Sequence, residues 1–399
     1  MWNESLQHLT FRFNFNQPIE AATWPPHLKH LRFGNKFKQP IERVVWNASL
    51  QHLTFVCSFN QPIEATTWPL HLKHLRFGNK FNQPIERVAW NASLQDLTFG
   101  YAFNQPIEAT TWPPHLKHLR FGNKFNQPIE KVACKASVRD LTFGDDFNQP
   151  IEATTWPGSL QNQRFGQGFN QPIEATTWPD SLQHLNLELT FGRSFNRPIA
   201  GSAGLPASLH RLEFGSNFNQ AINLVRWPPL LEQLIFGECF NQPVSIAAWP
   251  KPIQHLSFGK RFNQVIEGTL WPQHLQYLSF GAKFKQPIER VIVVWNASLQ
   301  HLTFVCSFNQ PIEATTWPLH LKHLRFGNKF NQPIERVAWN ASLQDLTFGY
   351  AFNQPIEATT WPPHLKHLRF GNKFNQPIEK VACKASVRDL TFGDDFNQP

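Results

Sequence analysis

A six-residue phrase, Phe-Asn-Gln-Pro-Ile-Glu with variants, recurs through the whole of this 399-residue chain. It occurs 18 times, and 14 of the 17 spacings between successive copies equal 22, the others being 26, 23 and 24. A fixed period of about 20–50 residues is typical of repeat architectures, in which each unit packs only on its neighbours. Because the pattern survives insertions of one to four residues, each unit is expected to be a complete structural element.

Residues 28–46 show what one coil should look like. Residues 30–33, His-Leu-Arg-Phe, alternate polar and apolar side chains, as a half-buried β-strand does. Gly34 ends the strand, and Pro40 cannot donate to a ladder, so the chain turns there. The sequence therefore predicts a mainly β repeat solenoid, resembling leucine-rich repeats, with one short parallel strand per 22-residue coil and about 18 coils. Residues 1–399 are predicted to form a single solenoid without a separate catalytic domain.

The aromatic residues follow the same register. Of 37 Phe residues, 18 open the recurring phrase and 18 end the predicted strands, while 14 of the 15 Trp residues occupy one turn position. Stacked coils would place these side chains in continuous columns. We interpret the columns as buried packing, and an aromatic binding platform is the less favoured alternative.

The unit at residues 116–129, Leu-x-x-Leu-x-Phe-Gly-x-x-Phe-Asn-Gln-Pro-Ile, resembles the FNIP repeat, a 22-residue relative of the leucine-rich repeat. The resemblance covers essentially the whole chain and implies a leucine-rich-repeat-like fold. This chain departs from the usual pattern in having Trp-Pro or Trp-Asn where Leu-Pro is common, which keeps the position apolar. Such repeats are sometimes attached to F-box or kinase modules. Neither module is visible here, so those activities are not carried over.

The residues on either side of the central Leu of each strand should point outward, and Lys residues lie close to them. Repeat solenoids often bind partners through such a strand face. We therefore expect a non-enzymatic scaffold that binds a protein partner through this face. The candidate residues are Lys73, His74, Arg76, Asp96, Lys117, His118, Arg120, Lys322, His323, Arg325, Lys366, His367 and Arg369.

Binding of nucleic acid or another polyanion through the same Lys, His and Arg rows is the alternative. The net charge of +9 favours it, but 18 units share that charge, which leaves half a charge per repeat. Asp residues stand between the His and Arg residues and should compensate part of the positive charge. Tyr277 is the one aromatic residue expected on the face, so a platform for stacking bases is not expected.

No pattern in the sequence indicates catalysis, a metal or a cofactor. The recurring His-x-x-His, as at residues 27–30, lacks an accompanying Cys, and Gly-Asp-Asp at residues 144–146 is a variant of the repeat. The five Cys residues are odd in number and separated by three or more coils, which favours a reducing compartment. With no signal peptide and no apolar run as long as a membrane-spanning helix, we expect a cytoplasmic protein that does not associate with membranes.

Two longer periods lie above the single repeat. Two coil types alternate through much of the chain, giving a 44-residue super-period, and residues 46–150 are identical to residues 295–399. That identity indicates a recent duplication, a recombination or an assembly artefact. The chain begins and ends within a unit and shows no polar cap. This is typical of a fragment of a longer gene product, and uncapped sheet ends also permit end-to-end self-association.

Overall fold

The computed structural model describes residues 2–129, 137–173, 175–186, 194–199, 205–245, 247–288, 295–378 and 386–398. Within these ranges the chain forms 18 short β-strands and no helix, which confirms the predicted β-solenoid with one strand per coil. The coils group into two compact units, Met1–Arg197 with Ala203–Leu209, and Pro198–Ser202 with His210–Pro399. Each unit is described by itself.

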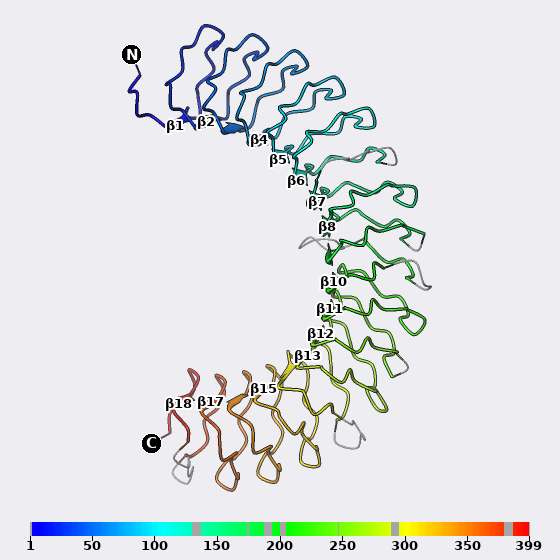
Figure 1. The fold of residues 1–399 in the computed structure, drawn as a ribbon. Coiled ribbons are helices and arrows are strands. Elements are labelled where there is room, and N and C mark those ends of the chain that lie inside the picture. Colours follow the sequence, from blue (N-terminus) through cyan, green and yellow to red (C-terminus); the bar gives the residue numbers. More distant parts are fainter. Residues whose placement is uncertain are drawn as a thin grey trace. The chain divides into compact units, whose positions relative to one another are not determined.

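The strands are short in both units (Figure 1). The first unit contains β1 His8–Thr10, β2 His30–Phe33, β3 His52–Phe55, β4 His74–Arg76, β5 Asp96–Thr98, β6 His118–Arg120, β7 Asp140–Thr142, β8 Asn162–Arg164 and β9 His184–Asn186. The second unit contains β10 Arg211–Glu213, β11 Gln233–Ile235, β12 His255–Ser257, β13 Tyr277–Phe280, β14 His301–Phe304, β15 His323–Arg325, β16 Asp345–Thr347, β17 His367–Arg369 and β18 Asp389–Thr391.

Within each unit, every strand pairs in parallel with the next strand along the chain, and equivalent residues of successive coils are partners. Leu31 of β2 is opposite Leu53 of β3, and Leu53 is opposite Leu75 of β4. The strands line the inner, concave side of each unit, and the turns lie on the outer side (Figure 1). This register places chemically equivalent side chains above one another, so that each position of the repeat becomes a row running across the strands.

The inward rows form the core. Phe121 is 2% exposed, and its ring stacks on Phe125 of the same coil at a centroid distance of 4.1 Å. It also stacks on Phe99 and Phe143 of the adjacent coils at 5.7 and 5.6 Å. The indole of Trp112, 7% exposed, packs edge-on against Phe121. The Trp and Phe columns are therefore packing elements, as predicted.

The Asn of the recurring phrase joins successive coils. The side-chain oxygen of Asn104 accepts a hydrogen bond from the backbone N–H of Asn126 at 2.9 Å, and Asn126 does the same for Asn148. The Nε2 of Gln149 donates to the Asn126 carbonyl at 2.9 Å. This ladder satisfies backbone donors in the turns and gives the Asn residues a structural role.

The cysteines make no bridge within the described residues. Cys57, Cys239 and Cys306 are free thiols. Cys134 and Cys383 lie outside the described residues.

Candidate functional site

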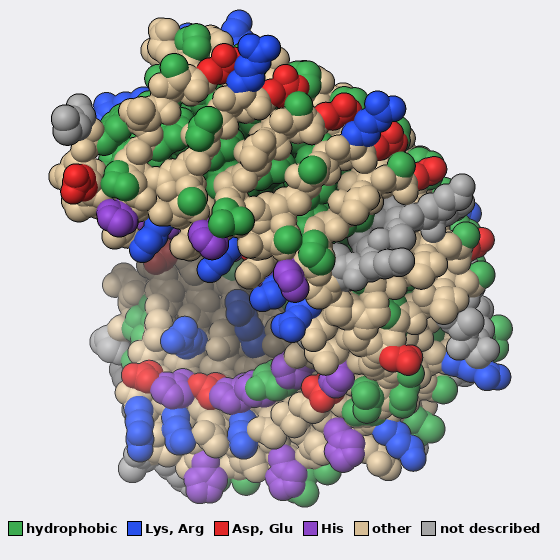
Figure 2. Space-filling view, turned by 45° about the horizontal axis from the view of Figure 1, so that its top comes forward, with side chains coloured by type: hydrophobic (Ala, Val, Ile, Leu, Met, Phe, Trp, Pro, Cys, Tyr) green, Lys and Arg blue, Asp and Glu red, His purple; other side chains and the backbone are tan. Residues whose placement is uncertain are grey.

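In β2–β8 and β10–β17 a buried central residue, Leu except for Gln163 of β8, has a more exposed residue on each side. In β6, Leu119 is 1% exposed, whereas His118 and Arg120 on either side of it are exposed. Stacked in register, these positions form two parallel rows across the strands. In the lower part of Figure 2, His and acidic side chains alternate in a row with Lys and Arg side chains on both sides. We call this surface the strand face.

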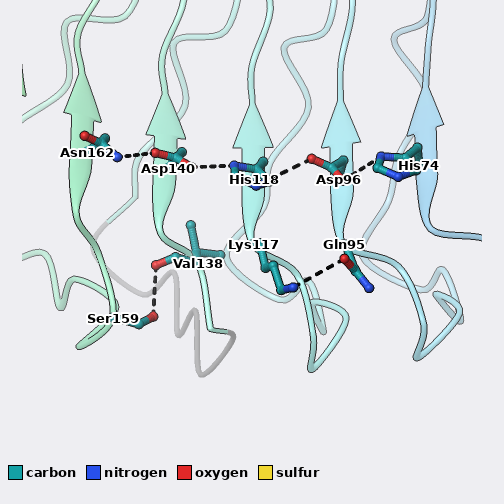
Figure 3. Close-up of polar contacts among 9 residues, drawn as sticks. All are labelled: His74, Gln95, Asp96, Lys117, His118, Val138, Asp140, Ser159 and Asn162. Carbon is teal, nitrogen blue, oxygen red and sulfur yellow. Dashed lines mark hydrogen bonds and ion pairs between the residues drawn. The ribbon is translucent and has the colours of Figure 1, made fainter.

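The first row, which we call the histidine–aspartate row, consists of the residues before the central Leu. In the first unit it begins with stacked imidazoles, with centroid distances of 4.2 Å from His8 to His30, 4.0 Å from His30 to His52 and 4.1 Å from His52 to His74. From His74 onward the row continues through polar contacts, which link Asp96, His118, Asp140 and Asn162 (Figure 3).

These polar contacts join each Asp to the His residues beside it. The Nδ1 of His74 lies 2.6 Å from a carboxylate oxygen of Asp96, whose other oxygen lies 3.8 Å from His118. His118 also pairs with Asp140, to which Asn162 donates a hydrogen bond. The carboxylates of Asp96 and Asp140 therefore both interact with neighbouring residues of the same row.

The second unit repeats this arrangement. The imidazole of His301 stacks between Tyr277 and His323, at 4.0 and 4.1 Å. His323 then pairs with Asp345 at 2.7 Å. Asp345 lies 3.9 Å from His367, which pairs with Asp389 at 2.5 Å.

Two histidines in the middle of the stacked segments have strongly lowered pKa values. Partial burial, followed by the neighbouring positive charges of His74 and His30, lowers the pKa of His52 to about 4. Partial burial and then the charges of His323 and Lys322 lower the pKa of His301 to about 4, against the opposite effect of Asp345. These two side chains are neutral at pH 7.

This neutrality predicts a loss of stability in acid. Well above pH 6.5 the folded and unfolded forms of His52 and His301 are both neutral, so the two residues add no pH dependence to stability there. Between pH 6.5 and about 4 the unfolded chain binds protons that the folded chain does not, so the free energy of unfolding falls as pH falls. The variant His52→Tyr/His301→Tyr should show a smaller drop in urea midpoint from pH 7.5 to pH 4.5.

Tyr is the matched replacement because Tyr277 already occupies this row and stacks on His301. The urea midpoint at pH 7.5 is the control and should change little. An identical drop in wild type and variant between pH 6.5 and 4 would contradict the lowered pKa values.

The second row, which we call the arginine row, consists of the residues after the central Leu. Arg and Thr alternate in this row from β2 to β8 and from β14 to β18, whereas β10 has Glu213 at this position. The Arg members are Arg32, Arg76, Arg120 and Arg164 in the first unit and Arg325 and Arg369 in the second. The Thr members between or beside them are Thr54, Thr98, Thr142, Thr303, Thr347 and Thr391.

The guanidinium groups of this row are exposed and unpaired. Among the described residues, none of the six Arg side chains has a protein carboxylate or hydrogen-bond acceptor as a partner, whereas Arg211 of β10 pairs with Glu213 at 2.9 Å. The expected compensation of positive charge therefore takes place within the histidine–aspartate row. It leaves the arginine row positively charged.

Both units have a shallow groove on the strand face. In the first unit the groove has a volume of about 510 Å³ and is lined by Arg32, Arg76, Arg120 and the intervening Thr residues. Tyr101, half exposed, also lines it. The groove of the second unit has a volume of about 420 Å³ and includes Arg325 and Arg369.

Sequence reasoning missed Tyr101 as a member of this surface. It follows the strand by three residues, in the turn, and the expectation of a single aromatic residue on the face considered only strand positions. The available signal was the replacement of the usual Gly-Asn-Lys by Gly-Tyr-Ala at residues 100–102. The Nζ of Lys124 lies 5.8 Å from the centroid of the Tyr101 ring.

The Lys residues predicted for the site lie at the entry of the strands, beside the histidine–aspartate row (Figure 3). Three of them bind the Gln of the preceding coil through Nζ and Oε1: Lys117 with Gln95 at 3.4 Å, Lys322 with Gln300 at 3.1 Å and Lys366 with Gln344 at 3.0 Å. The structure thus separates the predicted residues of each unit into a Lys border, the histidine–aspartate row and the arginine row.

Metal-binding and membrane-spanning features were sought in the part of the chain that the structure describes. There, no three His, Cys, Asp or Glu side chains come together in a way that could hold a metal ion. Across the same ranges we find no helix with the length and hydropathy that crossing a bilayer requires.

In-register parallel strands, one per 22-residue coil, define a solenoid of the leucine-rich-repeat class. The family model named FNIP Repeat matches much of the chain, and the chain belongs to this family. The matches cover residues 4–36, 15–58, 59–89, 81–124, 125–168, 147–188, 169–217, 195–239, 218–261, 308–350 and 330–373.

Solved structures agree with this assignment. The circular leucine-rich-repeat protein CroV588 is 42% identical over the whole of this chain, with a TM-score of 0.90, and the chain spans 58% of its length. YopM from Yersinia enterocolitica is 17% identical, with a TM-score of 0.50, over 99% of this chain and 92% of its own. A leucine-rich-repeat protein from Leptospira interrogans is 18% identical, with a TM-score of 0.51, over 87% and 84%. The last two show the fold alone. A search of curated proteins found no match.

Proposed function

We propose that this protein is a non-enzymatic scaffold that binds a protein partner through its strand face. The leucine-rich-repeat-like fold is typical of protein-interaction scaffolds. The observation that carries the proposal is that a groove lies on the strand face of each unit and that Arg and Thr residues of the arginine row line it in both units. Preformed, rigid and repeated polar side chains provide the directional contacts that recognition of a protein surface requires.

Binding of a polyanion is the second candidate, and the unpaired arginine row favours it. Two features of the face weigh against it. His52 and His301 are neutral at pH 7 because their pKa values are lowered to about 4. Asp96 and Asp140 add negative charge within the same face. A nucleic acid, which needs many phosphate contacts, would meet these carboxylates beside the arginine row.

Site-directed photo-crosslinking in an extract of cells that express the protein tests the proposal. A photoreactive amino acid at Thr98 or Thr347, each between two Arg residues of the row, should crosslink one and the same protein. The matched controls carry the photoreactive residue at Glu108 or Glu357, exposed positions in turns outside the grooves. These controls should give no such product.

Two results would contradict protein binding through the strand face. One is the same set of products from the groove and turn positions. The other is crosslinking to nucleic acid from Thr98 and Thr347 with no protein product. The second result would establish the polyanion alternative.

A further inference from the structure

We propose that the arginine row recognises an extended acidic segment of the partner, with one carboxylate bound to each guanidinium and with acidic residues at every third position. This inference rests on the proposed function, since it names the chemistry by which the strand face would bind a protein. Three observations carry it: the absence of protein partners for the arginine row among the described residues, the donors beside it, and its spacing.

The arginine row consists of unused hydrogen-bond donors with a permanent charge. A guanidinium has five N–H donors in a planar fork that fits a carboxylate with two parallel hydrogen bonds. Within the described residues, no protein acceptor occupies the guanidinium groups of Arg76 or Arg120. The half-buried Thr98 lies between them and adds a hydroxyl to the same groove.

The carboxylates that could have neutralised these groups are held elsewhere. Asp96 is bound by His74 and lies near His118, and Asp140 is bound by His118. From β2 to β8 and from β14 to β18, the alternation of coil types thus places acidic residues in one row and leaves the other row with a single sign of charge. A surface of this kind is complementary to carboxylates supplied by another molecule.

The spacing of the row selects the conformation of the ligand. Parallel strands lie about 4.8 Å apart, so Arg residues on every second strand are about 9.6 Å apart. A polyproline II segment has three residues per turn and a rise of about 3.1 Å, so every third residue returns to the same face after about 9.3 Å. Two other ligands fit this spacing of about 9.6 Å less well. Residues on the same side of a β-strand are about 6.7 Å apart, and successive phosphates of one DNA strand are about 3.4 Å apart along the helix axis.

An α-helix is the nearest competitor, with a same-face repeat of about 10.5 Å over seven residues. Over the three intervals from Arg32 to Arg164 its mismatch grows to roughly 3 Å, against roughly 1 Å for polyproline II. The concave side of the unit (Figure 1) brings side-chain tips closer together, which favours the shorter repeat. The exposed ring of Tyr101 lies in the same groove and offers an aromatic surface of the kind on which proline packs.

Fluorescence anisotropy with the full chain and labelled peptides tests the proposal. The probe is (Glu-Pro-Pro)4, and the matched peptide is (Glu-Pro-Pro-Pro)4, which has the same four carboxylates but moves them out of register. We expect the first peptide to bind at least tenfold more tightly at 50 mM salt. Binding of an oligothymidylate of 12 nucleotides is measured in the same way to test for recognition of nucleic acid.

Matched variants separate row geometry from net charge. Arg76→Gln/Arg120→Gln should weaken binding of (Glu-Pro-Pro)4 at least tenfold. Arg43→Gln/Arg87→Gln removes the same charge from exposed turn positions outside the groove and should change binding less than threefold. Because all four side chains are exposed or half-buried, the urea midpoint should be unchanged in both variants and serves as the folding control.

Each contrary result overturns a stated part of the proposal. Equal affinity for the two peptides, or equal loss in the groove variant and the turn variant, would show that charge alone matters and that spacing does not. Binding of the oligothymidylate without binding of either peptide would replace the acidic protein segment by nucleic acid. If Thr98 crosslinks a protein but neither peptide binds, the arginine–carboxylate assignment is wrong and the proposed function stands.

Discussion

Replacing Phe121 by Ala is expected to lower the free energy of unfolding by about 3–5 kcal/mol. The ring is 2% exposed and packs against five other aromatic rings, those of Phe99, Phe103, Phe125, Phe143 and Trp112. Neighbouring coils are held at the spacing of the strands, so they cannot close the cavity that a missing ring leaves. The loss therefore includes both the transfer of the ring to water and the cavity itself.

Urea denaturation followed by intrinsic fluorescence measures this effect, and hydrogen exchange in the flanking coils locates it. Local exchange is informative because each repeat contacts only its neighbours and can open without the rest of the chain. Phe13→Ala is the matched control, because this Phe lies outside the columns and is 56% exposed. The Phe13→Ala replacement should lower the free energy of unfolding by less than about 0.5 kcal/mol. An equal midpoint for Phe121→Ala and wild type would contradict the buried column.

Replacing Gly122 by Ala should lower the free energy of unfolding by about 3 kcal/mol or more. This is at or above the largest effects usual when an extra methyl group is forced into a packed core. A Cβ atom at this position would lie far closer than 3.0 Å to the carbonyl of Gly100 in the preceding coil. Among the described residues, Gly268 is the glycine with a positive φ, so Gly122 is required by the close approach of two backbones and not by its own conformation. The obstacle is backbone, which cannot rotate away as a side chain can.

Gly158→Ala is the control for this prediction, because no heavy atom lies within 4 Å of a Cβ built there. It should leave the urea midpoint unchanged or raise it slightly, since Ala restricts the unfolded chain. Val56 and Val305 occupy the equivalent position in two coils, where the turn sequence also changes to Val-Cys-Ser. An unchanged midpoint for Gly122→Ala would mean that the turn alone relaxes without those companion changes.

The 44-residue super-period sets the spacing of the arginine row. Two alternating coil types place Arg on every second strand, and this sets the spacing of about 9.6 Å on which the acidic-segment proposal depends. Because residues 46–150 and 295–399 have the same sequence, the same part of the strand face occurs in both units. Arg76 and Arg120 of the first unit correspond to Arg325 and Arg369 of the second.

Much of the fold and part of the site could be predicted from the repeat alone. The strand at residues 30–33, the turn after Gly34 and the inward Phe and Leu positions all follow from period 2 within a period of 22. The outward positions follow from the same alternation, and residues such as His118 and Arg120 are found on the strand face as expected.

The sequence by itself thus determined the coil, its strand, its buried columns and the list of outward side chains, because a short repeat can bury its apolar residues only by stacking on copies of itself. Only the tertiary structure decided which outward side chains are partners. Asp96 was expected to offset the cationic rows in general, yet it pairs with His74 and leaves Arg76 and Arg120 free. Tyr101, a turn residue, lines the groove although the sequence prediction considered only strand positions. Pairing depends on which atoms the lateral register of the strands brings within about 3–4 Å, and that distance is a property of stacked coils that no single repeat contains.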